Sequence, residues 1–477
     1  MVFRQRNIAV RSARLFALML ITSITAVAFQ VTLSKQSARQ RSPKLLSSSA
    51  NVQDAGSKPE IKEQEPSPLS MNLNELSSKL RGKGKAQVSW DCFKAGIDPL
   101  LFHNPSYPEK ELDNALNVLS DESTGINICK TTTRQEIQQH LPLRRQTQTL
   151  GEKALKSLSK SYPSALGIEP SLASLSQITR SGDGTTKLLL KLTNTDFFIE
   201  TVIIPHYDWN KSTLCISSQV GCAQGCVFCA TGKMGKLASL TTDQILIQLY
   251  FANKICRLNS DLPQIDNIVF MGMGEAGDNI DSVRKAVDVM TDRSCFALAP
   301  SKITISTVGP NPEVFSELTK ADAVLAWSIH AVRDDLRKKL VPTTKHSMKE
   351  LGDGVVRALR DRSKRLRNLM LEVTLMDGIN DGIKEAEEMA TYALDLMNRV
   401  DGMKLMINLI PFNDIGYAQY RRASDENVAA FQKVLVDAGV KAYVRTTRGD
   451  DESAACGQLA TKKRQKRPSV SDIHVAP

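Results

Sequence analysis

Residues 222–229 read CAQGCVFC and place Cys222, Cys226 and Cys229 in a C-x3-C-x2-C spacing. The apolar segment 212–217 before them predicts a strand, so the cysteines lie in the loop that follows it. Three thiolates at this spacing can bind three irons of a [4Fe–4S] cluster and leave the fourth iron open to a small molecule. Zinc is a weaker interpretation because it needs a fourth ligand, and neither a His nor a fourth Cys follows within the loop. A group of buried core cysteines is the third interpretation.

Around this loop, short apolar segments alternate with polar segments of helical periodicity. Such alternation is typical of a parallel sheet covered by helices, so we expect an α/β fold. Six βα units favour an open, partial (β/α)6 barrel over a closed eight-stranded one, with active residues just past the carboxyl ends of the strands. The expected strands are 212–217, 267–271, 302–306, 323–329, 369–375 and 403–410, and the expected helices are 242–257, 281–292, 312–319, 347–361, 383–398 and 424–437.

The region before the barrel carries no chemical motif. Its short amphipathic segments are interrupted by several prolines. Segments 188–192 and 197–204 have strand character and flank the turn sequence 193–196, which predicts a pair of strands at the end of this region.

Charge is concentrated at the two ends of the chain. The 477 residues are 42% hydrophobic and carry a formal charge of +11. Residues 1–53 contain eight Lys or Arg and no acid, and residues 461–477 contain five against one. The remaining 407 residues have 49 basic and 50 acidic side chains. Composition alone therefore does not predict a nucleic-acid binder, and any RNA-facing surface must be a local patch. Nine cysteines in this length exclude a disulfide-stapled mini-protein.

The N-terminal leader has two parts. An apolar run over 15–29 follows four arginines and contains the small-x-small sequence Ala26–Ala28, which predicts a secretory-type signal peptide; an uncleaved membrane anchor is the alternative. Residues 30–53 are rich in Ser, Gln, Lys and Arg, as in a transit peptide. This order resembles the bipartite presequence of algae with secondary plastids. We expect a mature protein without a membrane segment in the plastid stroma, with the cytoplasm as the alternative.

A glycine motif follows the second predicted strand. Residues 272–277 match G-x-G-x-x-G, and Asp292 lies 15 residues beyond, so NAD binding is one hypothesis. Glu275 inside the turn would repel a pyrophosphate, and the motif does not follow the first βα unit. The cysteine spacing, with Phe228 before its last cysteine, resembles the signature of radical S-adenosylmethionine (SAM) enzymes. Because a carboxylate suits the amino group of SAM, we favour Gly274 and Glu275 as SAM contacts.

Five segments occur in the same order as in the RlmN/Cfr family of radical SAM RNA methyltransferases. The chain resembles that family over about residues 186–460. The matching segments are Leu214–Cys222, Met271–Glu275, Ser328–Ala331, Ile407–Asn413 and Thr447–Leu459.

The resemblance implies a role for each of several residues. The cluster ligands would be Cys222, Cys226 and Cys229; the SAM contacts would be Gly274, Glu275, Ser306, Ser328, His330 and Asn413; and the catalytic residues would be Glu200, Cys215 and Cys456. Without the resemblance, Cys215 would be a core thiol, His330 a satisfied core histidine and Cys456 an ordinary loop cysteine. Ala276 departs from the family, which usually has Pro there.

The same resemblance implies a reaction that consumes two SAM molecules per turnover. Cys456 would take a methyl group from one SAM, and a radical from the second would activate that methyl for addition to adenine C2, which is not nucleophilic. Glu200 would remove the ring proton. Cys215 would then release the RNA and leave a Cys215–Cys456 disulfide, which thiol exchange resets.

The expected substrate is an adenosine of large-subunit (23S) rRNA and, in some members, of tRNA, with flavodoxin or ferredoxin as electron donor. C8 methylation and a radical SAM reaction on another substrate are the alternatives. The expected domains are a presequence and linker over 1–70, an RNA-binding accessory domain over 71–195, a methyltransferase domain over 196–460 and a disordered basic tail over 461–477.

Overall fold

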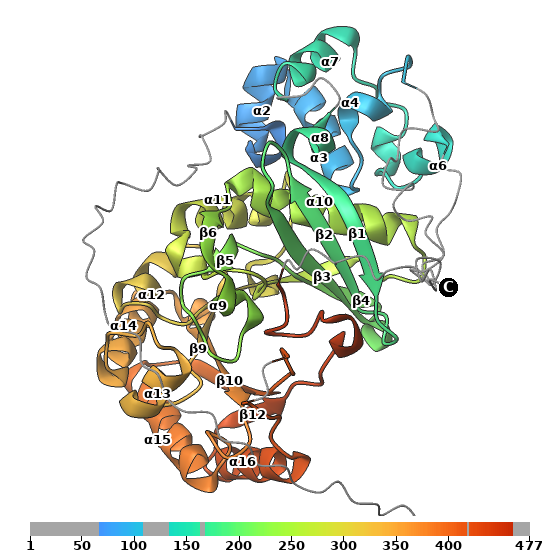
Figure 1. Cartoon of the computed structure of the whole chain (residues 1–477). Helices are drawn as coiled ribbons and strands as arrows, with labels where there is room; N and C mark the ends of the chain where they lie inside the picture. The colour runs from blue at the N-terminus through green and yellow to red at the C-terminus, as the bar shows by residue number, and fades with distance from the viewer. Residues whose placement is uncertain (1–65, 108–132, 163–166, 417–418, 461–477) are drawn as a thin grey trace, which may run out of the picture. The chain divides into compact units, whose positions relative to one another are not determined.

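The computed structural model describes residues 66–107, 133–162, 167–416 and 419–460, all within one compact unit, Glu60–Pro477 (Figure 1). The expected presequence and basic tail lie outside the described residues, so the localisation stays a prediction. Cys129 also lies outside them. The expected domain boundaries stay predictions as well.

A ten-stranded sheet organises the described chain, in the order β1-β2-β3-β4-β7-β8-β9-β10-β11-β12. Neighbours from β4 to β12 are parallel, and those from β1 to β4 are antiparallel. The sheet is open because β1 and β12 stand at its two ends. The strands are β1 (Ala173–Arg180), β2 (Thr186–Leu192), β3 (Phe198–His206), β4 (Lys211–Cys215), β7 (Ile265–Phe270), β8 (Ile303–Thr307), β9 (Val324–Ser328), β10 (Asn368–Leu375), β11 (Lys404–Pro411) and β12 (Lys441–Val444).

The predicted α/β partial barrel is confirmed, and each of its six strands lies within two residues of its expected ends. The predicted pair before the barrel is confirmed as β2 and β3. Sequence reasoning missed β12, which has four residues of which one is buried, and it missed the small hairpin of β5 (Gln219–Cys222) and β6 (Gly235–Ser239). That hairpin depends on Gly221, whose φ is 72° and whose Cβ would come within 1.8 Å of a carbonyl oxygen of the partner strand.

Helices follow the parallel strands and cover the outside of the sheet (Figure 1). Capping boxes start α10 at Thr241 and α14 at Ser347, each of which accepts a hydrogen bond from the backbone three residues on. The helices of this part are α9 (Ala230–Met234), α10 (Thr242–Leu258), α11 (Ile280–Thr291), α12 (Glu313–Leu318), α13 (Asp334–Leu340), α14 (Met348–Arg360), α15 (Ile383–Arg399) and α16 (Asp425–Asp437).

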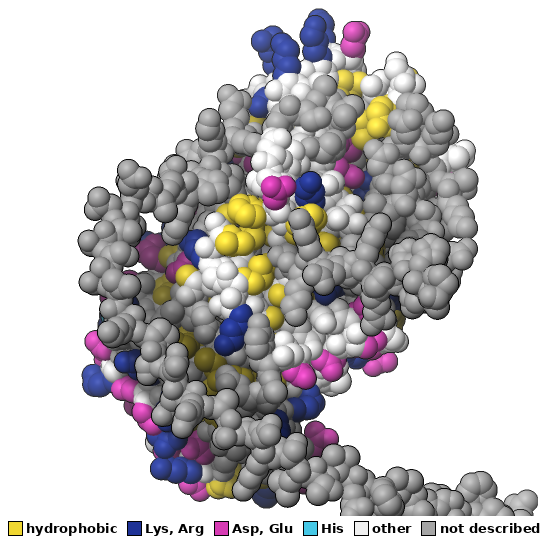
Figure 2. Space-filling model, in the orientation of Figure 1, with side chains coloured by type: hydrophobic (Ala, Val, Ile, Leu, Met, Phe, Trp, Pro, Cys, Tyr) yellow, Lys and Arg dark blue, Asp and Glu magenta, His cyan; other side chains and the backbone are white. Residues whose placement is uncertain are grey.

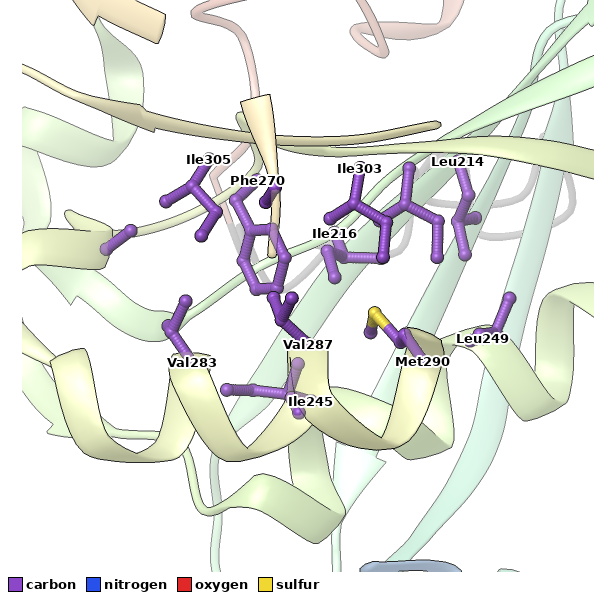
Figure 3. Packing of buried hydrophobic residues seen from close by; sticks show 14 of the residues in the cluster. Leu214, Ile216, Ile245, Leu249, Phe270, Val283, Val287, Met290, Ile303 and Ile305 are labelled. Carbon is purple, nitrogen blue, oxygen red and sulfur yellow. The ribbon is translucent and has the colours of Figure 1, made fainter. Parts of the chain in front are cut away.

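The main core lies between the sheet and these helices. Figure 3 shows side chains of the strands meeting those of α10 and α11; the labelled residues are Leu214, Ile216, Phe270, Ile303 and Ile305 from the sheet side and Ile245, Leu249, Val283, Val287 and Met290 from the helices. Successive strand side chains alternate between the two faces. Since Leu214 points to the helices, Thr213 and Cys215 point to the inside of the barrel, where both line a cavity.

Short helices make up the region before the sheet. They are η1 (Pro68–Ser70), α2 (Leu73–Leu80), α3 (Lys83–Lys94), α4 (Pro99–Phe102), α6 (Arg134–Gln138), η4 (Leu143–Arg145), α7 (Glu152–Ser159) and α8 (Ile168–Leu172). Residues 67–70, at the end of the expected linker, are buried, because Leu69 enters the core and Ser67 donates its backbone N–H to Asp243 of α10. Lys254 of α10 forms an ion pair with Glu169 of α8 at 2.5 Å.

The described surface is mixed in charge. Figure 2 shows basic and acidic side chains interspersed over this face. Within the described residues, no helix combines the length and hydrophobicity needed to cross a bilayer.

We expect Leu249→Ala to lower the free energy of unfolding by about 2–5 kcal/mol, because it opens a cavity where α10 packs on the sheet. Val436→Ala on the exposed side of α16 is the control and should change the free energy of unfolding by less than about 0.5 kcal/mol. Urea unfolding followed by circular dichroism measures both. Equal effects of the two variants would contradict the assigned core.

Candidate active site

The three motif cysteines lie between the strands of the small hairpin. Cys222 ends β5, and Cys226 and Cys229 follow before α9. The loop is held by hydrogen bonds from Val227 N to Leu340 O at 3.1 Å and from Ala230 N to Gly457 O at 2.7 Å. All three cysteines line one cavity of about 130 Å³. Burial raises the pKa of the Cys222 thiol to about 12.

The donor chemistry of this cavity fits an iron–sulfur cluster. Among the described residues, no three His, Cys, Asp or Glu side chains converge closely enough to hold a single metal ion. A four-iron cluster needs thiolates that are spaced apart, since each thiolate binds its own iron at a separate corner. Three thiols that share the wall of one cavity meet that requirement, and the cavity extends beyond them toward the expected SAM contacts.

The glycine turn after β7 is shaped by close packing. Gly274 has a φ of 106°, and a Cβ there would lie 2.6 Å from Gln219 Cβ. Glu275 is buried, and its carboxylate accepts hydrogen bonds from Gly277 N at 2.8 Å and Val308 N at 2.9 Å. Burial raises the pKa of Glu275 to about 7 despite these bonds. Because this carboxylate occupies the Gly277 amide of the turn and would repel a pyrophosphate, the turn does not suit NAD.

The other expected SAM contacts surround the same cavity. Ser306 Oγ lies 3.1 Å from Ser328 Oγ, at the ends of β8 and β9. Asn413 lies just past β11. The cavity is thus lined by all six expected contacts: Gly274, Glu275, Ser306, Ser328, His330 and Asn413.

His330 is held in one orientation. Its φ of 55° is in the left-handed region, which is uncommon for a non-glycine residue. Its Nδ1 accepts a hydrogen bond from Thr374 N at 3.1 Å, so the neutral ring carries its proton on Nε2. Burial and the nearby Arg337 lower the pKa of His330 to about 3. At neutral pH the ring is therefore an uncharged donor.

Cys215 and Cys456 both line a second, larger cavity of about 1060 Å³ inside the barrel. Both cysteines are free. Burial raises the pKa of Cys215 to about 12. Cys456 is exposed to the cavity, and desolvation by the surrounding walls raises its pKa to about 11; the Arg445 guanidinium opposes both shifts. The two cavities meet where they share lining residues, which are Met271, Glu372, Ile410, Asn413, Cys456 and Leu459.

Buried Glu372 lies at this junction and forms an ion pair with Arg445, which is partly exposed. Arg445 Nη1 lies 3.8 Å from Glu372 Oε2, and Asn408 Nδ2 donates to Oε1 at 2.9 Å. Glu372 Oε2 has no hydrogen-bond partner among the described residues. Burial raises the pKa of Glu372, which Arg445 partly offsets. The pair places a positive charge beside the two thiols.

Glu200 stands on β3 and pairs with Lys187 of β2. Lys187 Nζ lies 3.5 Å from Glu200 Oε1 and also donates to Ser453 O at 3.0 Å. Val202 lies opposite Cys215 in the register of β3 and β4, so Glu200, two residues away, shares the inner face with that thiol. Burial raises the pKa of Glu200, and Lys187 lowers it.

The loop that carries Cys456 is anchored at several points. Asn413 Nδ2 donates to Cys456 O at 3.1 Å. Asp451 accepts hydrogen bonds from Ser181 Oγ and from Gly182 N, the latter at 2.9 Å. Asn413 therefore holds this loop in addition to its expected contact with SAM.

The chain is similar to known proteins in sequence and in fold. The profile of the Radical SAM superfamily matches residues 216–392. The dual-specificity RNA methyltransferase RlmN of Xanthomonas campestris pv. campestris (strain B100) is 42% identical over 283 residues, which cover 58% of this chain and 70% of that protein. RlmN of Stenotrophomonas maltophilia (strain R551-3) is 41% identical over the same shares. The chain belongs to the RlmN family of radical SAM methyltransferases. A radical SAM methyltransferase from Sphaerobacter thermophilus has a similar solved structure, with a TM-score of 0.61, 28% identity, and coverage of 82% of this chain and 99% of that one.

Membership of the RlmN family implies a [4Fe–4S] cluster and SAM. Cys222, Cys226 and Cys229 are placed to hold the cluster, beside the cavity lined by the expected SAM contacts. The remaining cysteines of the described chain, Cys92, Cys256 and Cys295, are buried and do not line this cavity.

Sequence reasoning missed three charged residues of this RlmN-type site: Lys187, Glu372 and Arg445. A signal was present for Glu372, because it is the one charged residue in the apolar strand NLMLEVTL. Lys187 and Arg445 stand in segments where a charged residue is ordinary, and only the packing of strands and loops shows their partners.

We expect anaerobic reconstitution to give about four irons and four sulfides per chain. Cys226→Ala should lose the iron because it removes one of the three thiolates. Cys256→Ala removes a buried cysteine outside the motif, and this variant should keep its iron. Iron and sulfide analysis together with the visible absorption spectrum measures the difference. Full iron content in Cys226→Ala would show that the motif does not hold the cluster.

Proposed function

We propose that this chain methylates C2 of an adenosine in large-subunit ribosomal RNA, and in tRNA, as a radical SAM RNA methyltransferase. The observation that carries the proposal is the position of Cys215 and Cys456, two free thiols that line one cavity next to its junction with the expected SAM pocket. Relatives at 41–42% identity are called dual-specificity RNA methyltransferases, which supports RNA as the substrate.

When bound, the cluster and SAM would supply the methyl group and the one-electron chemistry that activates it. The protein's own residues would orient these groups and keep water out. Glu275 would receive the amino group of SAM, since it is a buried carboxylate on the cavity wall. His330 Nε2–H, Ser306 and Ser328 offer neutral hydrogen bonds on the same wall.

Cys456 would act as the methyl carrier. A thiolate is the competent nucleophile, and desolvation by the cavity walls, which raises the pKa of Cys456 to about 11, disfavours it at neutral pH. Arg445 favours the ionised form, whereas Glu372, which pairs with Arg445, disfavours it. Because Cys456 lines both cavities, its sulfur can receive a methyl group on one side and present it to a base on the other.

Glu200 would take the proton from the adenine ring once the methyl carbon is attached. Its Oε2 has no hydrogen-bond partner among the described side chains and backbone, so it is available as an acceptor. Burial raises the pKa of Glu200, and Lys187 opposes this by favouring the ionised form. Lys187 also bonds Ser453 O, so it ties the base to the loop that carries Cys456.

Cys215 would release the product. Its thiolate attacks the Cys456 sulfur, the bond between that sulfur and the methyl-derived carbon breaks, and the carbon takes up a proton. The two cysteines are left as a disulfide, which an external thiol reduces.

We expect Cys215→Ala to accumulate enzyme bound covalently to RNA through Cys456, because radical addition continues while release is lost. Cys456→Ala should carry no RNA, and the double variant should behave like Cys456→Ala, since release follows attachment. Denaturing gels and mass spectrometry of the digested adduct measure this. Cys295→Ala is the control and should methylate RNA normally.

Normal turnover by Cys215→Ala would overturn the assigned release step. An adduct at another cysteine would overturn the assigned carrier. Methylation of C8 instead of C2, read from the nucleoside products of the wild type, would replace the proposed position on the base.

The pH dependence tests Glu200 and Lys187. A general base works when ionised, so activity is lost as the pH falls through the pKa of Glu200. Lys187→Met removes the charge that lowers this pKa, so we expect the acidic limb of kcat/KM for RNA to move to higher pH. Lys187→Arg should restore the wild-type profile.

Lys191→Met on the same strand is the matched control, because Lys191 is exposed at the opposite end of β2. It should leave the pH profile unchanged. An acidic limb that does not move in Lys187→Met would show that Lys187 does not tune the base.

A further inference from the structure

The two cavities divide the space available to the reactants. The expected cluster ligands and SAM contacts line the smaller cavity. The target base must therefore reach Cys456 through the larger cavity, whose wall also includes Cys215. The residues at the far end of that cavity are the ones that an entering RNA strand meets first.

The far end lies at the amino ends of the parallel strands. Lys404 and Lys441, which begin β11 and β12, line the cavity there, as does Trp209 in the turn before β4. Strand β4 runs from Lys211 to Cys215, and a strand rises about 3.3 Å per residue, so this end is about 13 Å from Cys215. Trp209 is therefore too far away to contact the target base itself.

Trp209 is the exposed tryptophan of the described chain. Its relative accessibility is 72%, whereas Trp90 and Trp327 are 0% exposed. Its ring centroid lies 5.7 Å from that of His206, with 34° between the planes. A large exposed aromatic ring at the mouth of a cavity is a surface on which an unpaired base can stack.

The charges at this entrance suit a phosphate backbone. Lys404 and Lys441 are exposed. Arg448, in the loop after β12, also lines the cavity and lies 4.0 Å from Asp183. The acidic residue among those that line the cavity is Glu372, which is buried at the opposite end. The chain as a whole is nearly neutral between its two basic ends, so this is the kind of local patch that RNA binding requires.

We propose that Trp209 stacks on an unpaired nucleotide next to the target adenosine, while Lys404, Lys441 and Arg448 contact the phosphates of the same single-stranded segment. The inference rests on the proposed function, because it takes RNA as the substrate. It adds a recognition site for a neighbouring nucleotide, which would make the enzyme prefer an adenosine in an unpaired loop.

Tryptophan fluorescence tests the stacking directly and needs no turnover. Trp90 and Trp327 are fully buried, so quenching by a ligand at the surface reports on Trp209. We expect single-stranded oligoadenylate to quench the emission of the wild-type protein. The same strand paired with oligouridylate should not, because its bases are already stacked. Trp209→Phe should show no quenching.

Binding and kinetics complete the test. Trp209→Ala should weaken binding of single-stranded RNA by about 5- to 150-fold and raise KM for RNA, whereas Trp209→Phe should stay within about threefold of the wild type. Leu143→Ala removes another exposed hydrophobic side chain, which lines neither cavity, and should change neither value. Replacing Lys404 and Lys441 by Gln should reduce the slope of log K against log[salt] by about 1.4.

The outcomes separate this inference from the proposed function. If the wild type methylates RNA but single-stranded RNA neither quenches Trp209 nor binds Trp209→Ala more weakly, the inference is wrong and the function stands. If the wild type methylates no RNA, the function fails whatever Trp209 does. Quenching by a protein partner in place of RNA would also overturn the inference.

Discussion

The site depends on the contact between the loop after β12 and the turn between β1 and β2. The sheet is open, so the strands alone leave β12 unconnected to the antiparallel strands at the other end of the order. Asp451 accepts hydrogen bonds from Ser181 and Gly182, and Gly449 N donates to Asp183 at 3.2 Å. These bonds hold the loop against the turn, and the loop brings Cys456 to the cavity that Cys215 lines.

Two glutamates near the thiols are buried and ion-paired, and each has one oxygen without a hydrogen bond among the described residues. Glu200 is paired with Lys187, and Glu372 is paired with Arg445, yet one carboxylate oxygen of each glutamate has no hydrogen-bond partner among the described residues. Burying a polar atom without a partner costs free energy, about 1–3 kcal/mol in protein studies. Such atoms are expected at sites where a substrate or a proton is to be received, and both face the inside of the barrel.

The glycine turn beside the smaller cavity differs from the dinucleotide site that its spacing indicates. The G-x-G-x-x-G spacing is shared with dinucleotide sites, where glycine amides bind phosphate. Here the Glu275 carboxylate accepts hydrogen bonds from one glycine amide of the turn, that of Gly277, and from the Val308 amide, and burial raises its pKa to about 7. A carboxylate at this place suits a cationic amino group, in agreement with membership of the RlmN family.

The sequence by itself determined the elements and the motifs, because these depend on local periodicity and spacing. The alternation of apolar and polar segments located six strands and six helices, and C-x3-C-x2-C placed three thiols in one loop. The tertiary structure decided which side chains meet across the sheet. The contact of Lys187 with both Glu200 and Ser453, the place of Arg445 beside two thiols, and the position of Trp209 at the cavity entrance follow from the strand order and register. No local pattern encodes these, since the residues that meet lie far apart along the chain and are brought together only when the sheet and the final loop are in place.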